Sequence, residues 1–469
     1  MRETKRRLEA VSLYDHTGIE KHLKQMAEKG WMLEKITSLG WIYRRGEPKY
    51  GQFSVTYYPK ASEFDPELTE GQQLYQEFTA RSGWQFICSS AQMQVFYTEQ
   101  ENPTPIETDP VAQVENIHKA AKKNHLLPYV LYLVIGVLNG VLFVSRLLGD
   151  PIGTLASYTQ LFTGVVWTML LFLSAVELVR YFQWYRKATR AAEQGEFTDT
   201  PNNRGVQMFV LWTVTLCFAY WIINVMTVGS VMTRWVSILV YGYIIALLLI
   251  VNGMKQFLKR RKVSRGTNLT ITLIVDFVLA FAMMGAITFG TLRASRNGFF
   301  DQDAETYEYH GSTFILYQDQ LPLAVEDLLD VEYDGYVRQR RSEESLFLGM
   351  LEANQWSRLD DEEGRIHPGL NYTVAVIKAP FLYELCKERL ISEKDESANS
   401  EIPEGFKRVY LNVDPQPWGA VEAYQLAYQD TGALQRYLIC YEDRIVEISF
   451  DWEPTAEHKA IVGEKLGGK

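Results

Sequence analysis

LLPYVLYLVIGVLNGVLFVSRLL, residues 126–148, is an apolar run whose only charged residue, Arg146, lies near its end. It is the first of five such runs, at residues 126–148, 158–182, 206–228, 235–257 and 269–292. Each has about the 20 residues that a helix needs to cross about 30 Å of hydrocarbon. A helix in a soluble core rarely stays apolar on every face for so long. The sequence therefore predicts a multi-domain α+β membrane protein, with a five-helix transmembrane bundle between two polar domains.

The negative charge of the chain is concentrated in the residues that follow the fifth apolar run. Residues 293–469 hold 34 Asp and Glu against 18 Lys and Arg, whereas the whole chain has a net charge of −10. Phosphate contacts need clustered Lys and Arg, so we expect no direct binding of nucleic acid. We also expect no cleavable signal peptide, because no apolar run precedes Leu126.

Residues 1–100 carry the pattern of a small α+β domain that contains an internal repeat. Helical spacing of apolar residues predicts a helix at 19–29, which Asp15 or Thr17 caps and Gly30 ends. Alternating patterns predict strands at 11–14, 31–36, 40–45 and 52–58. A second helix at 70–81 runs into Gly83-Trp84 as the first runs into Gly30-Trp31, at an offset of 53 residues. Used twice, this unit would form a sheet with helices on one face.

The two repeated tryptophans allow two interpretations. Trp31 and Trp84 can be core aromatics that hold each helix against the sheet, or they can belong to an interaction surface that stacks on a ligand. Their position directly after the helix-ending glycines favours the core.

Three segments of this region resemble a known family. They are LKQMAEKGWMLEKI at 23–36, YRRGEP at 43–48 and VTYYP at 55–59. The stretch from about residue 13 to 100 is similar to the DUF2812 family of bacterial membrane-associated proteins of unknown function. The resemblance implies a bacterial protein whose gene often lies beside that of a PadR-like transcriptional regulator, which hints at signalling or stress response. It supplies no catalytic residues.

The connecting loops predict the orientation in the membrane. Residues 101–125 are expected to form a linker and a juxtamembrane helix that is basic at its end. Lys and Arg gather before the first run, between the second and third, and at 259–265 between the fourth and fifth. Because such residues stay on the cytoplasmic side, we expect a cytoplasmic N-terminus and an extracytoplasmic domain at 293–469 in the cell membrane. The 259–265 cluster could also hold anionic lipid headgroups.

The C-terminal part reads as a separate acidic α+β domain. Strands are predicted at 313–317, 370–379, 409–413, 423–428, 433–441 and 444–450, and helices at 381–391 and from Thr455 onward. The last three strands form an expected meander. Cys386 and Cys440 can form a disulfide if this domain lies outside the cell, and two free thiols explain them equally well.

No residues form a recognisable catalytic or cofactor-binding motif. We therefore predict a protein that is not an enzyme and has no cofactor. Glu177 and Asp276 lie within apolar runs, where a carboxylate usually faces a partner or water. They can couple helices or serve an ion step, or they can be satisfied structural contacts, with Glu177 turned toward Arg180. The acidic stretch at 301–308 and the run at 360–363 fit solvated faces better than calcium loops.

Three functions remain open at this point. The first is a sensor or signal transducer that couples the outer acidic domain to the inner domain, with a transcriptional regulator or another membrane protein as partner. The others are a membrane scaffold, and a transporter or enzyme component with a site near Asp276 and Glu177. Beyond the lipid bilayer, the sequence names neither a small-molecule ligand nor an oligomeric state.

Overall fold

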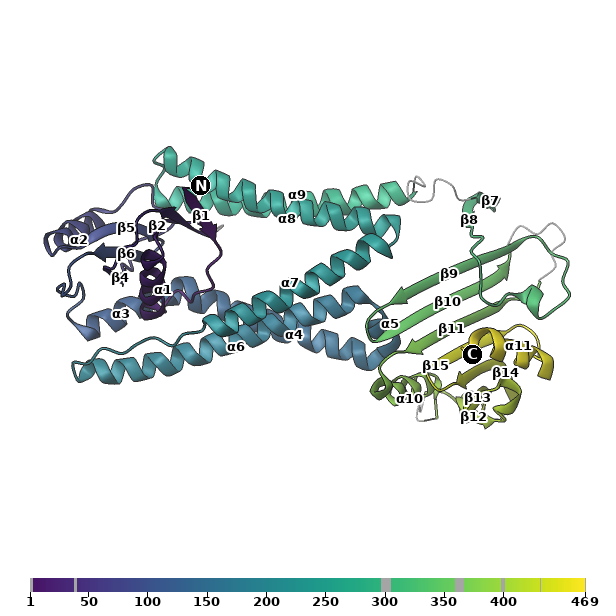
Figure 1. Cartoon of the computed structure of the whole chain (residues 1–469). Coiled ribbons are helices and arrows are strands. Elements are labelled where there is room, and N and C mark those ends of the chain that lie inside the picture. The colour runs from purple at the N-terminus through teal and green to yellow at the C-terminus, as the bar shows by residue number, and fades with distance from the viewer. Residues whose placement is uncertain are drawn as a thin grey trace. The chain divides into compact units, whose positions relative to one another are not determined.

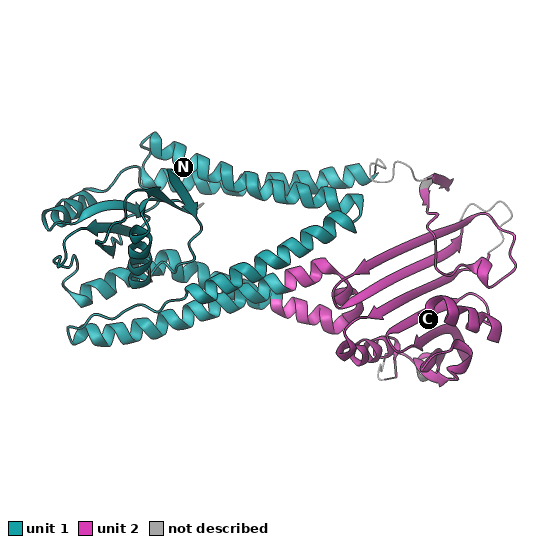
Figure 2. Ribbon diagram, in the orientation of Figure 1, with its two compact units in different colours: residues 1–139, 165–296 teal, residues 140–164, 297–469 magenta. Residues whose placement is uncertain are grey.

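A computed structural model of the chain describes residues 3–37, 40–296, 305–358, 367–397, 401–430 and 432–468. It divides into two compact units, residues 1–139 with 165–296, and residues 140–164 with 297–469 (Figure 2). The first holds a small N-terminal β domain, and the second a β-rich C-terminal domain. Between these domains the chain forms five long apolar helices. The predicted α+β class is confirmed at this level.

The N-terminal domain contains two three-stranded antiparallel sheets of the same topology (Figure 1). The first is built from β1 (Thr4–Arg7), α1 (His16–Glu28), β2 (Trp31–Thr37) and β3 (Gly40–Arg45), in the order β1-β3-β2. The second is built from β4 (Gln52–Tyr57), α2 (Glu70–Arg81), β5 (Gln85–Ser90) and β6 (Met93–Thr98), in the order β4-β6-β5. Each copy is therefore a strand, a helix and two strands, and the single sheet that we expected is two.

Local irregularities repeat at the same offset as the sequence. The β2–β3 ladder has a bulge at Leu33/Lys35, and the β5–β6 ladder has one at Phe86/Cys88, 53 residues later in both cases. The glycines that end the helices, Gly30 and Gly83, both adopt a positive φ, at 77° and 86°. A bulge needs one extra residue in one strand, so its recurrence at matching positions is a feature of the repeat.

Two details of the sequence prediction change. Asp15 is the N-cap of α1 and accepts a hydrogen bond from the Gly18 amide at 2.9 Å, so Asp15 rather than Thr17 caps the helix. The strand predicted at 11–14 is wrong, because these residues form a turn and β1 lies earlier, at Thr4–Arg7. Ser12 and Tyr14 are nevertheless buried, because they pack against the long apolar helices rather than in a sheet.

The long helices follow the five apolar runs and extend beyond them. Helix α3 (Pro110–Ala121) continues through a π-helical turn (Lys122–Leu126) into α4 (Leu127–Gly149). After the short α5 (Pro151–Ala156) come α6 (Tyr158–Glu193), α7 (Arg204–Thr227), α8 (Val231–Arg260) and α9 (Arg265–Arg296). Five helical segments, including the continuous 110–149, are long and apolar enough to cross a membrane. Most of their apolar side chains are exposed, as expected of helices whose solvent is lipid.

The second unit is organised around one seven-stranded antiparallel sheet in the order β12-β13-β14-β15-β11-β10-β9. Its strands are β9 (Tyr336–Glu344), β10 (Leu348–Ser357), β11 (Leu370–Ile377), β12 (Arg408–Val413), β13 (Glu422–Tyr428), β14 (Gly432–Cys440) and β15 (Arg444–Phe450). A hairpin of β7 (Glu305–Tyr309) and β8 (Ser312–Leu316) precedes it. The predicted β13–β15 strands are present, whereas β9 and β10 were not predicted.

Helices cover both faces of this sheet. One core joins sheet residues to Trp418 and to Val462 and Leu466 of α11 (Ala456–Leu466). The other joins them to Ile152 and Leu155 of α5, and to α10 (Tyr383–Lys394). Cys386 and Cys440 lie in this second core as buried, free thiols. The acidic residues predicted as solvated at 301–304 and 360–363 lie outside the described residues.

Candidate functional site

The carboxylate of Glu177 is the centre of a buried polar junction in the first unit. Its side chain is 0% exposed, near the middle of α6. Oε1 accepts from Gln207 Nε2 at 2.6 Å, and Oε2 accepts from Asn203 Nδ2 at 2.9 Å. The Ser12 hydroxyl lies 2.8–2.9 Å from both oxygens. One carboxylate thus joins the N-terminal domain, α6 and the start of α7.

The orientation of Asn203 is set by a second partner. Its Oδ1 accepts from Arg180 NH1 at 2.9 Å, so its Nδ2 faces Glu177 and the Tyr14 hydroxyl, the latter at 3.1 Å. The sequence suggested that Glu177 turns toward Arg180. Arg180 instead holds the side-chain amide of Asn203, and this amide donates to Glu177. A buried carboxylate with several donors is stabilised in place, whereas removing its donors leaves an unpaired buried group.

Aromatic rings enclose this junction. The buried Tyr14 ring packs edge-on against His125 and Tyr181, with centroids 4.9 Å apart in each case, and lies 5.6 Å from Trp184. His125 of the π-helical turn also approaches Glu177, with Nε2 3.6 Å from Oε2. Tyr14 thus anchors the turn before α1 among side chains of α6 and the α3–α4 connection.

A second polar group joins the same domain to the first residue of α7. Arg204 NH1 lies 2.9 Å from His22 Nδ1, and His22 Nε2 lies 3.1 Å from Glu9 Oε2. A guanidinium can only donate, so Nδ1 accepts and the ring proton is on Nε2, facing Glu9. Burial alone would raise the pKa of the Glu9 carboxyl, but the His22 hydrogen bond and the charges of Arg7 and Arg204 lower it overall.

A third contact fixes the loop between α6 and α7. The Thr200 hydroxyl donates to Asp15 Oδ1 at 2.6 Å and lies 2.7 Å from the Thr17 hydroxyl. Burial raises the pKa of the Asp15 carboxyl, although hydrogen bonds from Thr200 and Gly18 oppose the shift. The residue that caps α1 therefore also binds the loop, so a displacement of this loop acts directly on the start of α1.

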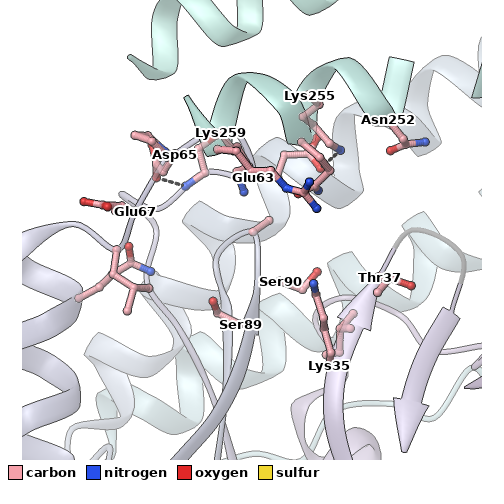
Figure 3. A pocket seen from close by; sticks show the side chains of 18 residues that line it. Lys35, Thr37, Glu63, Asp65, Glu67, Ser89, Ser90, Asn252, Lys255 and Lys259 are labelled. Carbon is pink, nitrogen blue, oxygen red and sulfur yellow. Dashed lines mark hydrogen bonds and ion pairs between the residues drawn. The ribbon is translucent and has the colours of Figure 1, made fainter. Parts of the chain in front are cut away.

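The segment between β4 and α2 binds the other helix pair of this unit, α8 and α9. Lys255 Nζ pairs with Glu63 at 3.0 Å, and Arg265 NH1 donates to the Lys60 carbonyl at 3.0 Å. Asn268 Nδ2 donates to the Phe64 carbonyl at 3.3 Å. Beside these contacts a cavity of about 740 Å³ lies between the domain and the end of α8 (Figure 3).

The other residues singled out in the sequence lie apart from the junction. Asp276 is half-buried on α9, and no hydrogen bond or ion pair joins it to any described residue, Glu177 included. Trp31 is half-buried, with Lys5 5.4 Å and Arg45 5.9 Å from its ring centroid. Trp84 is 4% exposed, and its ring N–H donates to the Thr104 carbonyl at 2.8 Å. As a surface for a partner, only Trp31 is accessible.

Sequence reasoning singled out Glu177 and missed its partners. Ser12, Asn203 and Gln207 are ordinary polar residues at element ends, with no periodicity that links them. The only available signal was their position, since Asn203 and Gln207 flank the start of the third apolar run. Within the described residues, no group of three His, Cys, Asp or Glu could hold a metal ion.

Comparisons with known proteins place the N-terminal region. No match was found among curated proteins or among solved structures. The family match includes α3 and the π-helical turn, whose residues Val114, Ile117 and Ala120 belong to the same core as α1 and the sheets. Residues 15–129 match the family described as "Protein of unknown function (DUF2812)", which confirms the resemblance and extends it to the start of α4.

Proposed function

We propose that this chain is a non-enzymatic bacterial membrane protein, a sensor or signal transducer that couples an extracytoplasmic acidic domain to a cytoplasmic DUF2812-like domain. The observation that carries the proposal is the Glu177 junction, where one buried carboxylate binds the N-terminal domain and two apolar helices together. A shift of α6 against α7 would change the distances to Ser12, and with them the stability of the docked domain.

The C-terminal domain binds residues that lie just before the N-terminal end of α6. Ser345, in the turn before β10, donates to the Leu155 carbonyl of α5 at 2.5 Å, and Arg389 donates to the Gly149 carbonyl at 2.8 Å. Helix α6 begins two residues after α5. A ligand or partner that changes the packing of the C-terminal domain on α5 would therefore act on the beginning of α6.

The loops that each domain binds support the proposed orientation. The N-terminal domain binds the α6–α7 connection through Thr200 and the α8–α9 end through Arg265, next to the clusters of Lys and Arg. The C-terminal domain binds the α4–α6 connection, where residues 149–157 hold no Lys or Arg. In a chain that crosses the bilayer at each long helix, these connections alternate in side, and Lys and Arg mark the cytoplasmic one.

Sidedness is the first test. Single cysteines replace the exposed residues Glu47 and Ser397, and intact cells are treated with a membrane-impermeant maleimide. The wild type is the control, because Cys88, Cys386 and Cys440 are buried and Cys217 is half-buried on α7. We expect Ser397→Cys to react in intact cells and Glu47→Cys to react only after lysis. Equal protection of both sites until lysis would overturn the sensor and favour a cytoplasmic scaffold.

The partner is tested with the full chain in lipid nanodiscs. We expect it to bind a PadR-like transcriptional regulator, and we expect Glu177→Gln to change that affinity while Glu193→Gln, exposed at the end of α6, does not. Transduction requires two states that a partner binds unequally, so a variant that loosens the junction must change binding. No binding by the wild type would remove the regulator from the proposal.

A further inference from the structure

The cavity of about 740 Å³ beside α8 is lined by three segments of the N-terminal domain and by the last turns of that helix. Figure 3 shows Lys35, Thr37 and Ser90 on one side, and Asn252 and Lys255 of α8 on the other. The domain side comes from the end of β2, the 62–68 segment and the β5–β6 turn. Both repeats of the domain therefore contribute to the cavity.

The charges around the cavity leave an excess of unpaired cations. Its three carboxylates already have cationic partners, since Glu63 pairs with Lys255 at 3.0 Å, Glu67 with Lys262 at 2.6 Å and Asp65 with Arg265 at 3.9 Å. By contrast, the lining residues Lys35, Lys259 and Arg260 have no ion-pair partner among the described residues. Three cations from two separate elements thus face one space without an ion-pair partner, although the charges of Glu63 and Asp65 also act on Lys259.

The remaining polar lining suits a phosphate group. Ser89 and Ser90 offer hydroxyl donors, and Asn252 and Gln256 offer amide donors, whereas the Thr37 hydroxyl already donates to the Gly40 carbonyl. Phosphate oxygens accept several charge-assisted hydrogen bonds at once, and Lys and Arg are their usual partners in proteins.

The face of α8 that enters the cavity continues as an apolar stripe. Asn252, Gln256 and Lys259 lie at helical spacing from Leu248 and Ile245, so these residues share one face. Ile245, Leu248 and Leu249 are 59%, 55% and 58% exposed. A polar, basic end that follows an exposed apolar stripe is the arrangement that a lipid needs, with its headgroup in the cavity and its acyl chain along the helix.

We propose that this cavity binds the phosphate headgroup of an anionic phospholipid, so that the membrane itself helps to fix the N-terminal domain on α8. The group that the cavity would bind is a phosphate monoanion or diester, and a soluble phosphate compound also carries such a group. The proposal rests on the membrane placement of α8, which is part of the proposed function.

The test uses the full chain purified in mild detergent and reconstituted in nanodiscs of phosphatidylcholine, with or without phosphatidylglycerol. Native mass spectrometry counts the phospholipids that remain bound. For the wild type we expect at least one retained phosphatidylglycerol and a higher unfolding temperature in the anionic discs. For Lys35→Gln/Lys259→Gln we expect loss of that lipid and about 30-fold weaker binding, because each basic group near an anionic surface contributes about 1 kcal/mol.

A matched control separates the cavity from general charge. Arg186→Gln/Lys187→Gln removes two exposed cations from α6 without touching the cavity, and should retain the lipid. Thr37→Phe keeps every charge and fills the cavity, and this variant should lose the lipid. If the cavity variants retain phosphatidylglycerol as the wild type does, the proposal is overturned. It is equally overturned if inorganic phosphate alone gives the same stabilisation at millimolar concentration, since the acyl chain would then add nothing.

The proposed function can fail separately. Alkaline extraction of membranes is scored first for the wild type and for the two cavity variants, Lys35→Gln/Lys259→Gln and Thr37→Phe. Release of the wild type by alkali would overturn the membrane placement itself, whereas integration of all three, with lipid lost only from the cavity variants, supports the headgroup site.

Discussion

The Ser12 hydroxyl lies 2.8 Å from Oε2 and 2.9 Å from Oε1 of Glu177, although the two residues are 165 positions apart in the chain. A hydroxyl has one proton, so Ser12 donates to one oxygen at a time, and it accepts from Gln207 Nε2 at 2.9 Å. This contact places a residue just before the DUF2812-matched region against the middle of an apolar helix. The dependence of domain docking on the helices can therefore be tested at a single pair.

Glu177→Gln should loosen the junction. Gln207 can turn its side-chain amide so that its Oε1 accepts from the new amide at position 177, because this oxygen has no partner among the described residues. Asn203 cannot, since Arg180 holds its Oδ1, so the oxygen of the new amide must face Asn203 and its NH2 must face Gln207. The turned Gln207 then no longer donates to Ser12. We expect a loss of about 1–3 kcal/mol in the free energy of unfolding.

The measurement is hydrogen exchange of the full chain in detergent, together with its unfolding temperature. Exchange should become faster at residues 9–17, where the domain meets the helices. Glu193→Gln is the control, because that side chain is exposed at the end of the same helix. Unchanged exchange at 9–17 would show that the carboxylate does not hold the domain.

Asp276→Asn should leave stability unchanged to within about 0.5 kcal/mol, because no described residue pairs with this carboxylate. The comparison with Glu177→Gln decides between functions. A transporter or enzyme component with a site near these residues requires that Asp276 or Glu177 be essential. If the phenotype of the gene survives both substitutions, that alternative is excluded, whereas a loss in Asp276→Asn alone would favour it over a signal transducer.

Gly30→Ala should destabilise the N-terminal repeat. Gly30 has a φ of +77°, and an added Cβ would lie 2.7 Å from the Gly46 carbonyl oxygen, a backbone atom that cannot move alone. The expected cost is about 1–3 kcal/mol. Gly46→Ala is the matched control, since its Cβ would meet no atom within 4 Å. Thermal unfolding of both variants makes the comparison, and equal midpoints would contradict the prediction.

Local signals account for what the sequence predicted well. Asp15 before an apolar period and glycine after it define α1, and the same glycine signal marks the end of α2. The β13–β15 strands follow from their alternating patterns and short connections. The five long helices follow from length and hydropathy alone, because a run of this kind has few other structures open to it.

What the sequence missed depends on tertiary contacts. Strand β9, YVRQRRSEE, is largely charged after its first two residues, and it forms because β10 pairs along its whole length. Its arginines are tolerated because it is the edge strand of the seven-stranded sheet. The partners of Glu177 could not be found, because Ser12 and Asn203 come together only once the domain docks on the helices.

Glu20 and Glu107 predict a pH dependence of stability. Both line a cavity of about 290 Å³ in the N-terminal domain, together with Trp84. Burial, together with nearby carboxylates in the case of Glu20, raises the pKa of each carboxyl from 4.5 to about 7. Since the folded state then binds more protons than the unfolded state between these values, stability must fall as the pH rises from about 4.5 to about 7.

Glu20→Gln should remove its part of this dependence. The amide oxygen can still accept from the Val55 N–H, which lies 2.7 Å from Glu20 Oε1, so the fold keeps its hydrogen bond without a buried charge. We expect a gain of about 1–3 kcal/mol at pH 8 and little change at pH 4.5, where the wild-type carboxyl is already protonated in the folded state. Unfolding midpoints of the detergent-solubilised chain at both pH values make the test. Glu28→Gln, at an exposed position on the same helix, should follow the wild type. A Glu20→Gln variant whose midpoint falls with pH as steeply as that of the wild type would show that this carboxyl is ionised in the folded protein well below neutral pH.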